Sequence, residues 1–352
     1  MHQEILRWVW DEEALHALCA DLPLAALIAI MVVSVAILSK GADWMIDGVV
    51  DLARRTGLPR IVIGATVVSL GTTSPEAFVS VMAAWMGNPG LALGNGVGSI
   101  ICDTGMIFGL TCLLTRVPID RYILNRTGWV QVAAAVLLVA ISVGAWYVTP
   151  EAPVLQRWVG FFFLSLLLAY LYAAYVWAKR APASSTAQAE EEEDEQPASL
   201  ARAWLLLLGG LVLVIAAARM LIPAAAELAV RMGVPDDVIA ATMVAFGTSL
   251  PELMTAISSI RKGHPEITVG NIVGADVLNC LFVIGAAAAA RPLEIPSNFY
   301  RFHFPAMLLI LFSFRVFISM NRSGRFAKWQ GAWLLGIYLV YLALQYIWGM
   351  AL

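Results

Sequence analysis

Residues 71–80 read GTTSPEAFVS, and residues 247–256 read GTSLPELMTA. Each stretch places a proline and a glutamate, Glu76 or Glu252, side by side within a long apolar segment. Proline interrupts a helix, and a charged side chain at the centre of a bilayer costs about 2.5–3.5 kcal/mol on the insertion scale. One copy alone could be an ordinary kinked membrane helix. Two copies at matching positions predict a functional site.

The composition of the whole chain is that of a polytopic membrane protein. Of its 352 residues, 60% are hydrophobic and only 13% are charged, whereas about 25% are charged in a typical soluble domain. A membrane-spanning helix needs roughly 20 apolar residues. We therefore predict an all-α fold with ten transmembrane helices, at 24–40, 60–86, 90–114, 128–148, 156–178, 203–225, 237–260, 266–290, 303–319 and 329–350.

Two parts of the chain are copies of one sequence unit. An offset of 176 residues aligns 63–110 with 239–286 without a gap and gives 15 identities in 48 positions. The copies lie in two predicted five-helix repeats, 24–178 and 203–352, and an odd number of spans inserts the second repeat upside down relative to the first. Inverted repeats are the plan of many secondary transporters, whose sites lie at the repeat interface near the midplane.

The regions outside the two repeats are polar. Residues 1–23 are predicted to form an interfacial amphipathic segment and not a cleaved signal peptide, and residues 179–202 an acidic flexible linker. Loops on the linker's side of the membrane carry 14 Lys and Arg residues, against 5 on the other side. The positive-inside rule then places the linker in the cytoplasm of a bacterial-type cell and both termini outside.

Proline and glutamate together suggest a cation site. Pro75 and Pro251 have no N–H, so carbonyls of the preceding turn become available as acceptors, which membranes tolerate only inside protein or at a polar cavity. If the repeats face each other, Glu76 and Glu252 meet among these carbonyls and several hydroxyl groups. An anionic, all-oxygen environment suits a hard cation, and Ca²⁺ in particular takes about 6–8 oxygen ligands.

The next predicted span in each repeat adds polar groups, in GNGVGSIICD (94–103) and GNIVGADVLN (270–279). The GxxxG spacings indicate close helix packing. Asp103 follows Asn95, and Asn279 follows Asn271, by about two helical turns, so each pair shares a helix face. Asp276 is an additional acid, interpreted either as a fourth ligand or as a partner for a cation elsewhere.

Other functional classes are poorly supported by the sequence. The four cysteines form no CxxC pair and are expected to be small core residues. An intramembrane aspartyl protease would need aspartates in YD and GxGD settings, and neither string occurs. We predict that the protein is not an enzyme and needs no cofactor, and a passive cation channel stays as a distant alternative.

The doubled motifs resemble those of the Ca²⁺/cation antiporter superfamily, most closely the prokaryotic sodium/calcium exchangers. IGATVVSLGTTSPEAFVS with GNGVGSIICDTGMIFG is similar to the family's first repeat, and IAATMVAFGTSLPELMTA with GNIVGADVLNCLFVIG to its second. The resemblance covers essentially the whole ten-span plan. It implies that the second, third, seventh and eighth helices form an ion-binding core, across which the first and sixth helices slide.

The resemblance also implies a set of ligands. Glu76 and Glu252, with the backbone carbonyls of Thr72 and Thr248, would bind Ca²⁺. Na⁺ would share this centre and use flanking sites, which would be built from Ser69, Thr73, Ser99, Asp103, Ala245, Ser249 and Asn279.

This sequence departs from the family pattern in three places. Asp103 and Asn279 exchange the positions of acid and amide. Ala275 stands where a serine is expected, and Asp276 follows it in place of asparagine. The sixth span carries Arg219, whereas the first span is acidic. These departures concern the coupling ion and the stoichiometry.

We therefore predict a secondary active antiporter that exchanges Ca²⁺ for Na⁺ by alternating access and exports Ca²⁺. Exchange of Ca²⁺ for H⁺, or K⁺-dependent exchange, on the same site is the alternative, because facing glutamates can take up protons. The third acid, Asp103, favours Na⁺. The expected partners are Ca²⁺, Na⁺ and the lipid bilayer, not nucleic acid, and a monomer should suffice for transport.

Overall fold

The predicted all-α class is confirmed by the computed structural model, which describes residues 18–181, 199–232, 249–320 and 324–349. Short π-helical turns (η) interrupt several of the helices. The elements up to residue 181 are α3 (Leu24–Thr56), α4 (Arg60–Ile63), η1 (Gly64–Val68), α5 (Ser69–Thr72), α6 (Ser74–Met86), α7 (Pro89–Cys102), η2 (Asp103–Ile107), α8 (Phe108–Leu114), α9 (Arg121–Val148), β1 (Val154–Leu155) and α10 (Arg157–Lys179).

The remaining described elements belong to the second half. They are α12 (Leu200–Arg231), α14 (Leu250–Arg261), α15 (Pro265–Leu278), η4 (Asn279–Val283), α16 (Ile284–Ala290), β2 (Leu293–Glu294), η5 (Phe299–His303), α17 (Phe304–Met320) and α18 (Lys328–Gly349). Most of the predicted N-terminal segment 1–23 and of the linker 179–202 lies outside the described residues.

The element boundaries repeat at the offset found in the sequence. The run α7, η2, α8 begins at Pro89 and ends at Leu114, and the run α15, η4, α16 begins at Pro265 and ends at Ala290, 176 residues later at every boundary. The contacts repeat as well, because α9 packs on α15 and η4 while α17 packs on α7 and η2. The sequence duplication is therefore a structural duplication, and the inversion of one copy relative to the other stays a prediction.

Seven helices in the described part of the chain are long and apolar enough to cross a membrane, and the bent pair 60–72 and 74–86 would make an eighth. The predicted span 24–40 is part of the longer helix α3. The predicted span 237–260 is described only from residue 249 onward, and α18 occupies the last predicted span. The count of ten stays a prediction.

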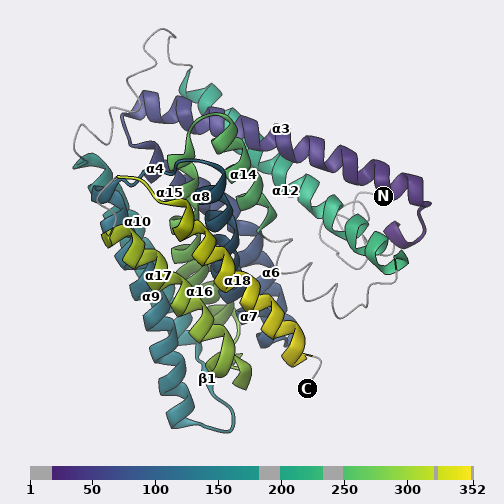
Figure 1. Cartoon of the computed structure of the whole chain (residues 1–352). Coiled ribbons are helices and arrows are strands. Elements are labelled where there is room, and N and C mark those ends of the chain that lie inside the picture. The colour runs from purple at the N-terminus through teal and green to yellow at the C-terminus, as the bar shows by residue number, and fades with distance from the viewer. Residues whose placement is uncertain (1–17, 182–198, 233–248, 321–323, 350–352) are drawn as a thin grey trace.

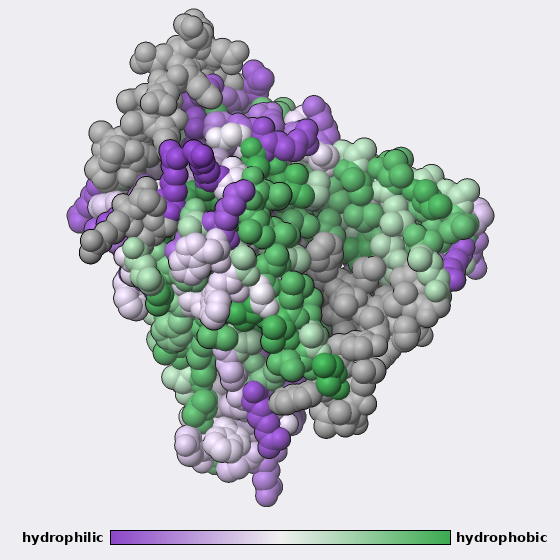
Figure 2. Space-filling model, viewed as in Figure 1, coloured by the Kyte–Doolittle hydropathy of each residue, from purple (hydrophilic) through white to green (hydrophobic). Residues whose placement is uncertain are grey.

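The outer surface agrees with a membrane environment. Large apolar side chains face outward along the described helices, among them Val32, Leu168 and Leu205 with exposed fractions of 65%, 68% and 72%. Figure 2 shows hydrophobic residues over the flank of the molecule and hydrophilic residues gathered mainly toward its upper end. A soluble monomer rarely exposes so large a continuous apolar surface.

Helices α3 and α12 form a close pair that stands apart from the bundle of α9, α10, α16, α17 and α18 (Figure 1). Glycines allow the two backbones to approach. A Cβ atom on Gly48 would lie 2.6 Å from the Leu207 nitrogen, and one on Gly210 would lie 2.4 Å from the Gly41 carbonyl oxygen. Small residues at such positions let membrane helices pack closely.

The second GxxxG pair joins the two halves of the protein. A Cβ atom on Gly270 would lie 2.1 Å from the Ile61 carbonyl oxygen, and one on Gly274 would lie 2.4 Å from that of Ala65. Helix α15 therefore presses on α4 and η1 of the first half. Gly98, the counterpart of Gly274, has no atom within 4 Å of such a Cβ among the described residues.

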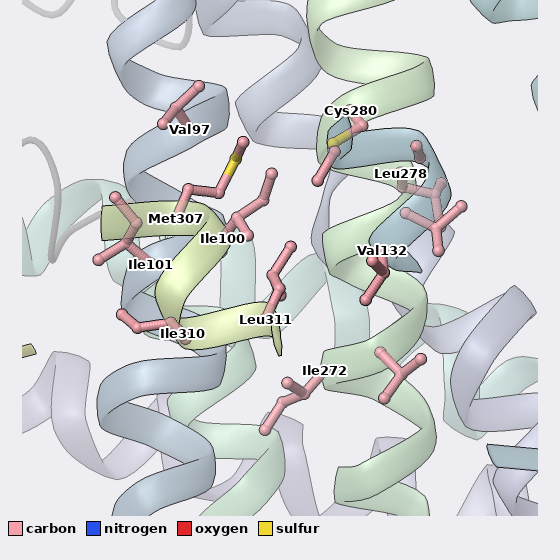
Figure 3. Close-up of a cluster of buried hydrophobic side chains, with 14 of the residues drawn as sticks. Val97, Ile100, Ile101, Val132, Ile272, Leu278, Cys280, Met307, Ile310 and Leu311 are labelled. Carbon is pink, nitrogen blue, oxygen red and sulfur yellow. The ribbon is translucent and has the colours of Figure 1, made fainter. Parts of the chain in front are cut away.

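The largest apolar cluster lies between α7, α9, α15 and α17, and includes Val97, Ile100, Val132, Ile272 and Met307 (Figure 3). Each of these side chains has an exposed fraction of 3% or less. Because both halves contribute to the cluster, it holds the two copies together around the polar residues described below.

Replacing Gly270 with alanine should destabilise the fold, because the new methyl group meets backbone atoms of α4. Overpacking of this kind typically costs about 1–3 kcal/mol, so the melting temperature of the purified protein in detergent should fall by several degrees. Gly144→Ala is the matched control, since nothing in the described structure lies within 4 Å of its Cβ position. A melting temperature unchanged in Gly270→Ala would contradict the close packing.

Candidate ion-binding site

The first Pro-Glu stretch breaks its helix, as predicted. The helical segments 60–72 and 74–86 meet at Thr73 with a bend of 40°, and Pro75 occupies the first turn of α6, where its missing N–H costs nothing. Glu76 follows in the same first turn. In the second copy α14 begins at Leu250, with Pro251 and Glu252 at the same helical positions.

Three π-helical turns lie next to the two breaks. η1 ends directly before Ser69, η2 begins at Asp103, and η4 begins at Asn279. A π turn widens the backbone by one residue and is frequent at functional sites. These turns were not predicted from sequence, yet two of them start at the acid and amide positions that the sequence singled out.

The structure buries every described residue of the predicted ligand set in the protein interior. Their exposed fractions are 1% or less for Ser69, Thr72, Thr73, Glu76, Ser99, Asp103, Ser249, Glu252, Asp276 and Asn279. Ala245 and Thr248 belong to the predicted set but lie outside the described residues. Elements from both halves carry the set: η2 packs on α14, and η4 packs on α6.

Most of these side chains leave an oxygen atom without a hydrogen-bond partner among the described residues. Ser69 and Thr72 are exceptions, since their hydroxyl groups donate to the carbonyls of Thr66 and Ser69. The unpartnered atoms are Thr73 Oγ1, Glu76 Oε2, Ser99 Oγ, Asp103 Oδ1, Ser249 Oγ, Glu252 Oε2, Asp276 Oδ1 and Asn279 Oδ1. A buried acceptor without a donor costs about 1–3 kcal/mol, so this group of oxygen atoms is suited to a bound cation.

The charges at the site are unbalanced. Glu76 interacts electrostatically with Glu252 and Asp103, and Asp276 with Glu252. In the described part of the chain, none of these four carboxylates forms a salt bridge with lysine, arginine or histidine. Bound cations or protons would neutralise them, because burying unpaired charge costs several kcal/mol per ion.

Carboxylates alone do not make a chelating cluster here. Among the described residues, no group of three or more His, Cys, Asp or Glu side chains is arranged to hold a metal ion. Hydroxyl, amide and backbone oxygen atoms would have to complete a coordination shell, as is usual for Ca²⁺.

Buried amides position the ligands. Asn95 Nδ2 donates to the Glu76 carbonyl oxygen and to Ser80 Oγ, both at 3.0 Å. Asn271 Oδ1 accepts a hydrogen bond from Thr72 Oγ1 at 3.4 Å. Asn95 therefore holds α6 in place, and Asn271 holds α5. Both asparagines were predicted to share a helix face with residues 103 and 279.

Sequence reasoning missed the partners of Asp276. Its Oδ2 accepts hydrogen bonds from Thr104 Oγ1 and from Gln131 Nε2. Gln131 lies on α9, in a span with few other polar residues, and a lone amide in an apolar membrane helix is the signal that could have identified it.

The acidic side chains of the first helix contact another helix. Ser258 Oγ donates to Asp43 Oδ1 at 2.6 Å, and Lys262 Nζ donates to Asp47 Oδ1 at 2.5 Å. These contacts tie α3 to α14.

Comparison with known proteins gives consistent matches along the chain. The family model described as sodium/calcium exchanger protein matches residues 26–176 and 202–347. The inner membrane protein YrbG of Escherichia coli is 32% identical over 321 residues, which cover 90% of this chain and 96% of that protein. The sodium/calcium exchanger MaX1 of Methanosarcina acetivorans is 25% identical over 343 residues, 90% of this chain and 97% of that one.

Solved structures of the sodium-calcium exchanger NCX_Mj have the same fold. The structure soaked with 10 mM Na⁺ and zero Ca²⁺ aligns with a TM-score of 0.77 at 24% identity, covering 91% of this chain and 99% of that one. The structure soaked with 2.5 mM Na⁺ and 10 mM Sr²⁺ aligns with a TM-score of 0.76.

Replacing Asn95 with leucine should weaken cation binding while the fold persists, because the backbone of Glu76 loses its side-chain support. A hydrogen bond of this kind contributes about 0.5–1.5 kcal/mol, so the half-saturating Ca²⁺ concentration should rise roughly 2- to 10-fold. Titration of the purified protein with Ca²⁺ measures this change. Asn88→Ala is the control, since Asn88 only caps the start of α7 through Leu91 and should alter stability without altering affinity.

Proposed function

The chain belongs to the sodium/calcium exchanger protein family, and on this premise we propose that it exchanges Ca²⁺ for Na⁺ across a membrane by alternating access. The observation that carries the proposal is the set of buried oxygen atoms without partners, contributed by both halves of the protein and including four carboxylates without a basic partner in the described chain. Such a set requires cations and offers only oxygen ligands to them.

In the proposed site Ca²⁺ is held by Glu76 and Glu252, with the backbone carbonyls of Thr72 and Thr248. The two glutamates supply the charge that a hard divalent cation needs, and each has an oxygen atom free of other partners in the described structure. The Na⁺ ions share this centre and occupy flanking positions, which we assign to Ser69, Thr73, Ser99, Asp103, Ala245, Ser249 and Asn279.

Charge compensation would couple the two fluxes. An empty site carries several bare carboxylates, and each charge at the bilayer centre costs about 2.5–3.5 kcal/mol or more. The site can change its access only when cations neutralise it, either one Ca²⁺ or several Na⁺. Movement of the empty carrier is thereby suppressed, and the inward Na⁺ gradient drives Ca²⁺ export.

The paired helices α3 and α12 are the proposed moving part. They contact each other closely through Gly41, Gly48 and Gly210, and a cavity of about 430 Å³ lies beside Leu211 of α12 where it meets Gly71 of α5. The cavity is lined mainly by apolar side chains such as Leu70, Leu207 and Leu211. Apolar surfaces without interlocking polar contacts let one pair of helices slide across another.

The contacts of α3 with α14 hold one position of this movement. Their repeat counterparts, 176 residues away, are Arg219 for Asp43 and Met82 for Ser258, so the same pair of hydrogen-bonding groups is not repeated in the other half. One access state is therefore stabilised by polar contacts that its counterpart lacks. The loop charges place this end of α14 on the cytoplasmic side of the cell membrane, with the linker 179–202, and both termini outside.

Flux measurements test the proposed exchange directly. Proteoliposomes containing the purified protein should take up ⁴⁵Ca²⁺ under an outward Na⁺ gradient with the pH gradient collapsed. Glu76→Gln and Glu252→Gln should each abolish the uptake, because the site loses one of its two central charges. Ca²⁺ uptake that follows a pH gradient and ignores Na⁺ would support proton exchange and contradict the proposal, and near-normal exchange by either variant would contradict the paired-glutamate site.

Linking α3 to α14 should stop transport, if α3 moves. The variant Asp43→Cys with Ser258→Cys, made after replacement of the four buried native cysteines, should lose ⁴⁵Ca²⁺ flux on treatment with a thiol cross-linker and regain it on reduction. The two single-cysteine variants are the controls and should be insensitive to the cross-linker. Full flux in the cross-linked double variant would mean that α3 and α14 do not separate during transport.

A further inference from the structure

A buried polar cluster lies beside the proposed exchange centre, and none of its three residues is assigned there as a ligand of Ca²⁺ or Na⁺. Asp276 on α15 accepts hydrogen bonds at Oδ2 from Thr104 Oγ1 on η2 and from Gln131 Nε2 on α9, the latter at 2.5 Å. All three side chains are 1% exposed or less. Three separate elements from both halves therefore converge on one carboxylate.

The cluster retains two oxygen atoms that accept nothing. Because Gln131 donates through its nitrogen, its Oε1 is an acceptor, and neither this atom nor Asp276 Oδ1 has a hydrogen-bond partner among the described residues. Within the same residues, no lysine, arginine or histidine pairs with Asp276. The negative charge of Asp276 thus has no basic partner among the described residues, and the two acceptor atoms, Asp276 Oδ1 and Gln131 Oε1, have no hydrogen-bond donor there.

The packing of the fold does not require this cluster to be polar. The 176-residue offset relates Asp276 to Ile100, Thr104 to Cys280 and Gln131 to Met307, and all three counterparts belong to the apolar cluster of Figure 3. Their exposed fractions are also 0%. Each trio takes residues from both halves, and the repeat-related trio is apolar where this one has an acid with two polar partners.

We propose that Asp276 and Gln131 form an accessory site for a monovalent alkali cation, with Thr104 as a positioning residue. The inference rests on the proposed function, since it assigns this site to the same transport cycle. Thr104 and the Gln131 amide group fix Asp276 Oδ2, so that Oδ1 and Gln131 Oε1 serve as ligands. Backbone or water oxygen atoms complete the shell.

The charge at the site selects a monovalent ion. A single carboxylate is neutralised by one positive charge, and two free protein oxygen atoms fall short of the 6–8 ligands that Ca²⁺ takes. Na⁺ and K⁺ share the required chemistry. Occupancy would neutralise Asp276, which interacts electrostatically with Glu252 and Asp103, and would thereby add one alkali cation to the coupled ions.

The test measures alkali-cation binding, so that its result is independent of Ca²⁺ flux. Equilibrium dialysis of the purified protein with ²²Na⁺, and separately with ⁸⁶Rb⁺ as a K⁺ tracer, gives the number of ions bound at constant pH without Ca²⁺. The variants are Asp276→Asn, Gln131→Met and the triple variant Asp276→Ile, Thr104→Cys, Gln131→Met, which copies the apolar counterpart. Ser142→Ala is the control, because among the described residues this hydroxyl group on α9 bonds only to the Leu138 carbonyl.

The wild type and Ser142→Ala should bind one more ion than the triple variant, and Gln131→Met should bind that ion at least tenfold more weakly. The tracer that shows the difference identifies the ion as Na⁺ or K⁺. Equal binding by the wild type, Gln131→Met and the triple variant would overturn the accessory site. Loss in Asp276→Asn with no change in Gln131→Met would also overturn it, because Asp276 would then act on the main centre alone.

The melting temperature separates this result from misfolding. The triple variant should melt no lower than the wild type, because buried apolar side chains of the same kinds already occupy the repeat-related positions. Absence of Na⁺-driven Ca²⁺ uptake in the wild type would refute the proposed exchange, and the difference in bound ions would still be measurable.

Discussion

The burial of four carboxylates without a basic partner in the described chain is the constraint on which the rest of the structure depends. Glu76, Asp103, Glu252 and Asp276 are each 1% exposed, and their mutual repulsion adds to the cost of removing them from water. A fold that bears this cost must provide ligands for mobile cations, and it must hold those ligands rigidly enough to define a site. The surrounding amides and hydroxyl groups serve this purpose.

Duplication supplies the ligands in pairs. The helices that start after Thr73 and after Ser249 each carry a glutamate in the first turn, and a π turn begins at Asp103 and at Asn279, the same position in each copy. Close approach of α15 to α4, through Gly270 and Gly274, brings the halves into contact. A kink that would be a defect in one helix thus becomes half of a composite site.

The two copies differ at two groups of polar residues, the cluster around Asp276 and the acids of α3. Asp276 with its partners replaces an apolar trio, and the acids of α3 that contact α14 have no acidic counterpart in α12. Neither difference follows from the packing of the fold, because the other copy fills the same positions with different chemistry. Differences between the two copies therefore identify residues whose chemistry the shared packing does not require.

The sequence by itself determined the all-α class, the duplication, the broken helix at Thr73 and the burial of the acids, because hydropathy, proline chemistry and a constant offset are local or periodic properties of the chain. Only the tertiary structure decided which groups meet. Gln131 and Asp276 are 145 residues apart, and Asp43 and Ser258 are 215 apart, so the periodicity of neither helix specifies its partner. The π turns also escaped prediction, because the one-residue shift in helical phase that they cause is not visible in a span that is apolar on almost every face. The residues of a membrane helix determine that it forms and that it is apolar, whereas its contacts depend on how all the helices pack together.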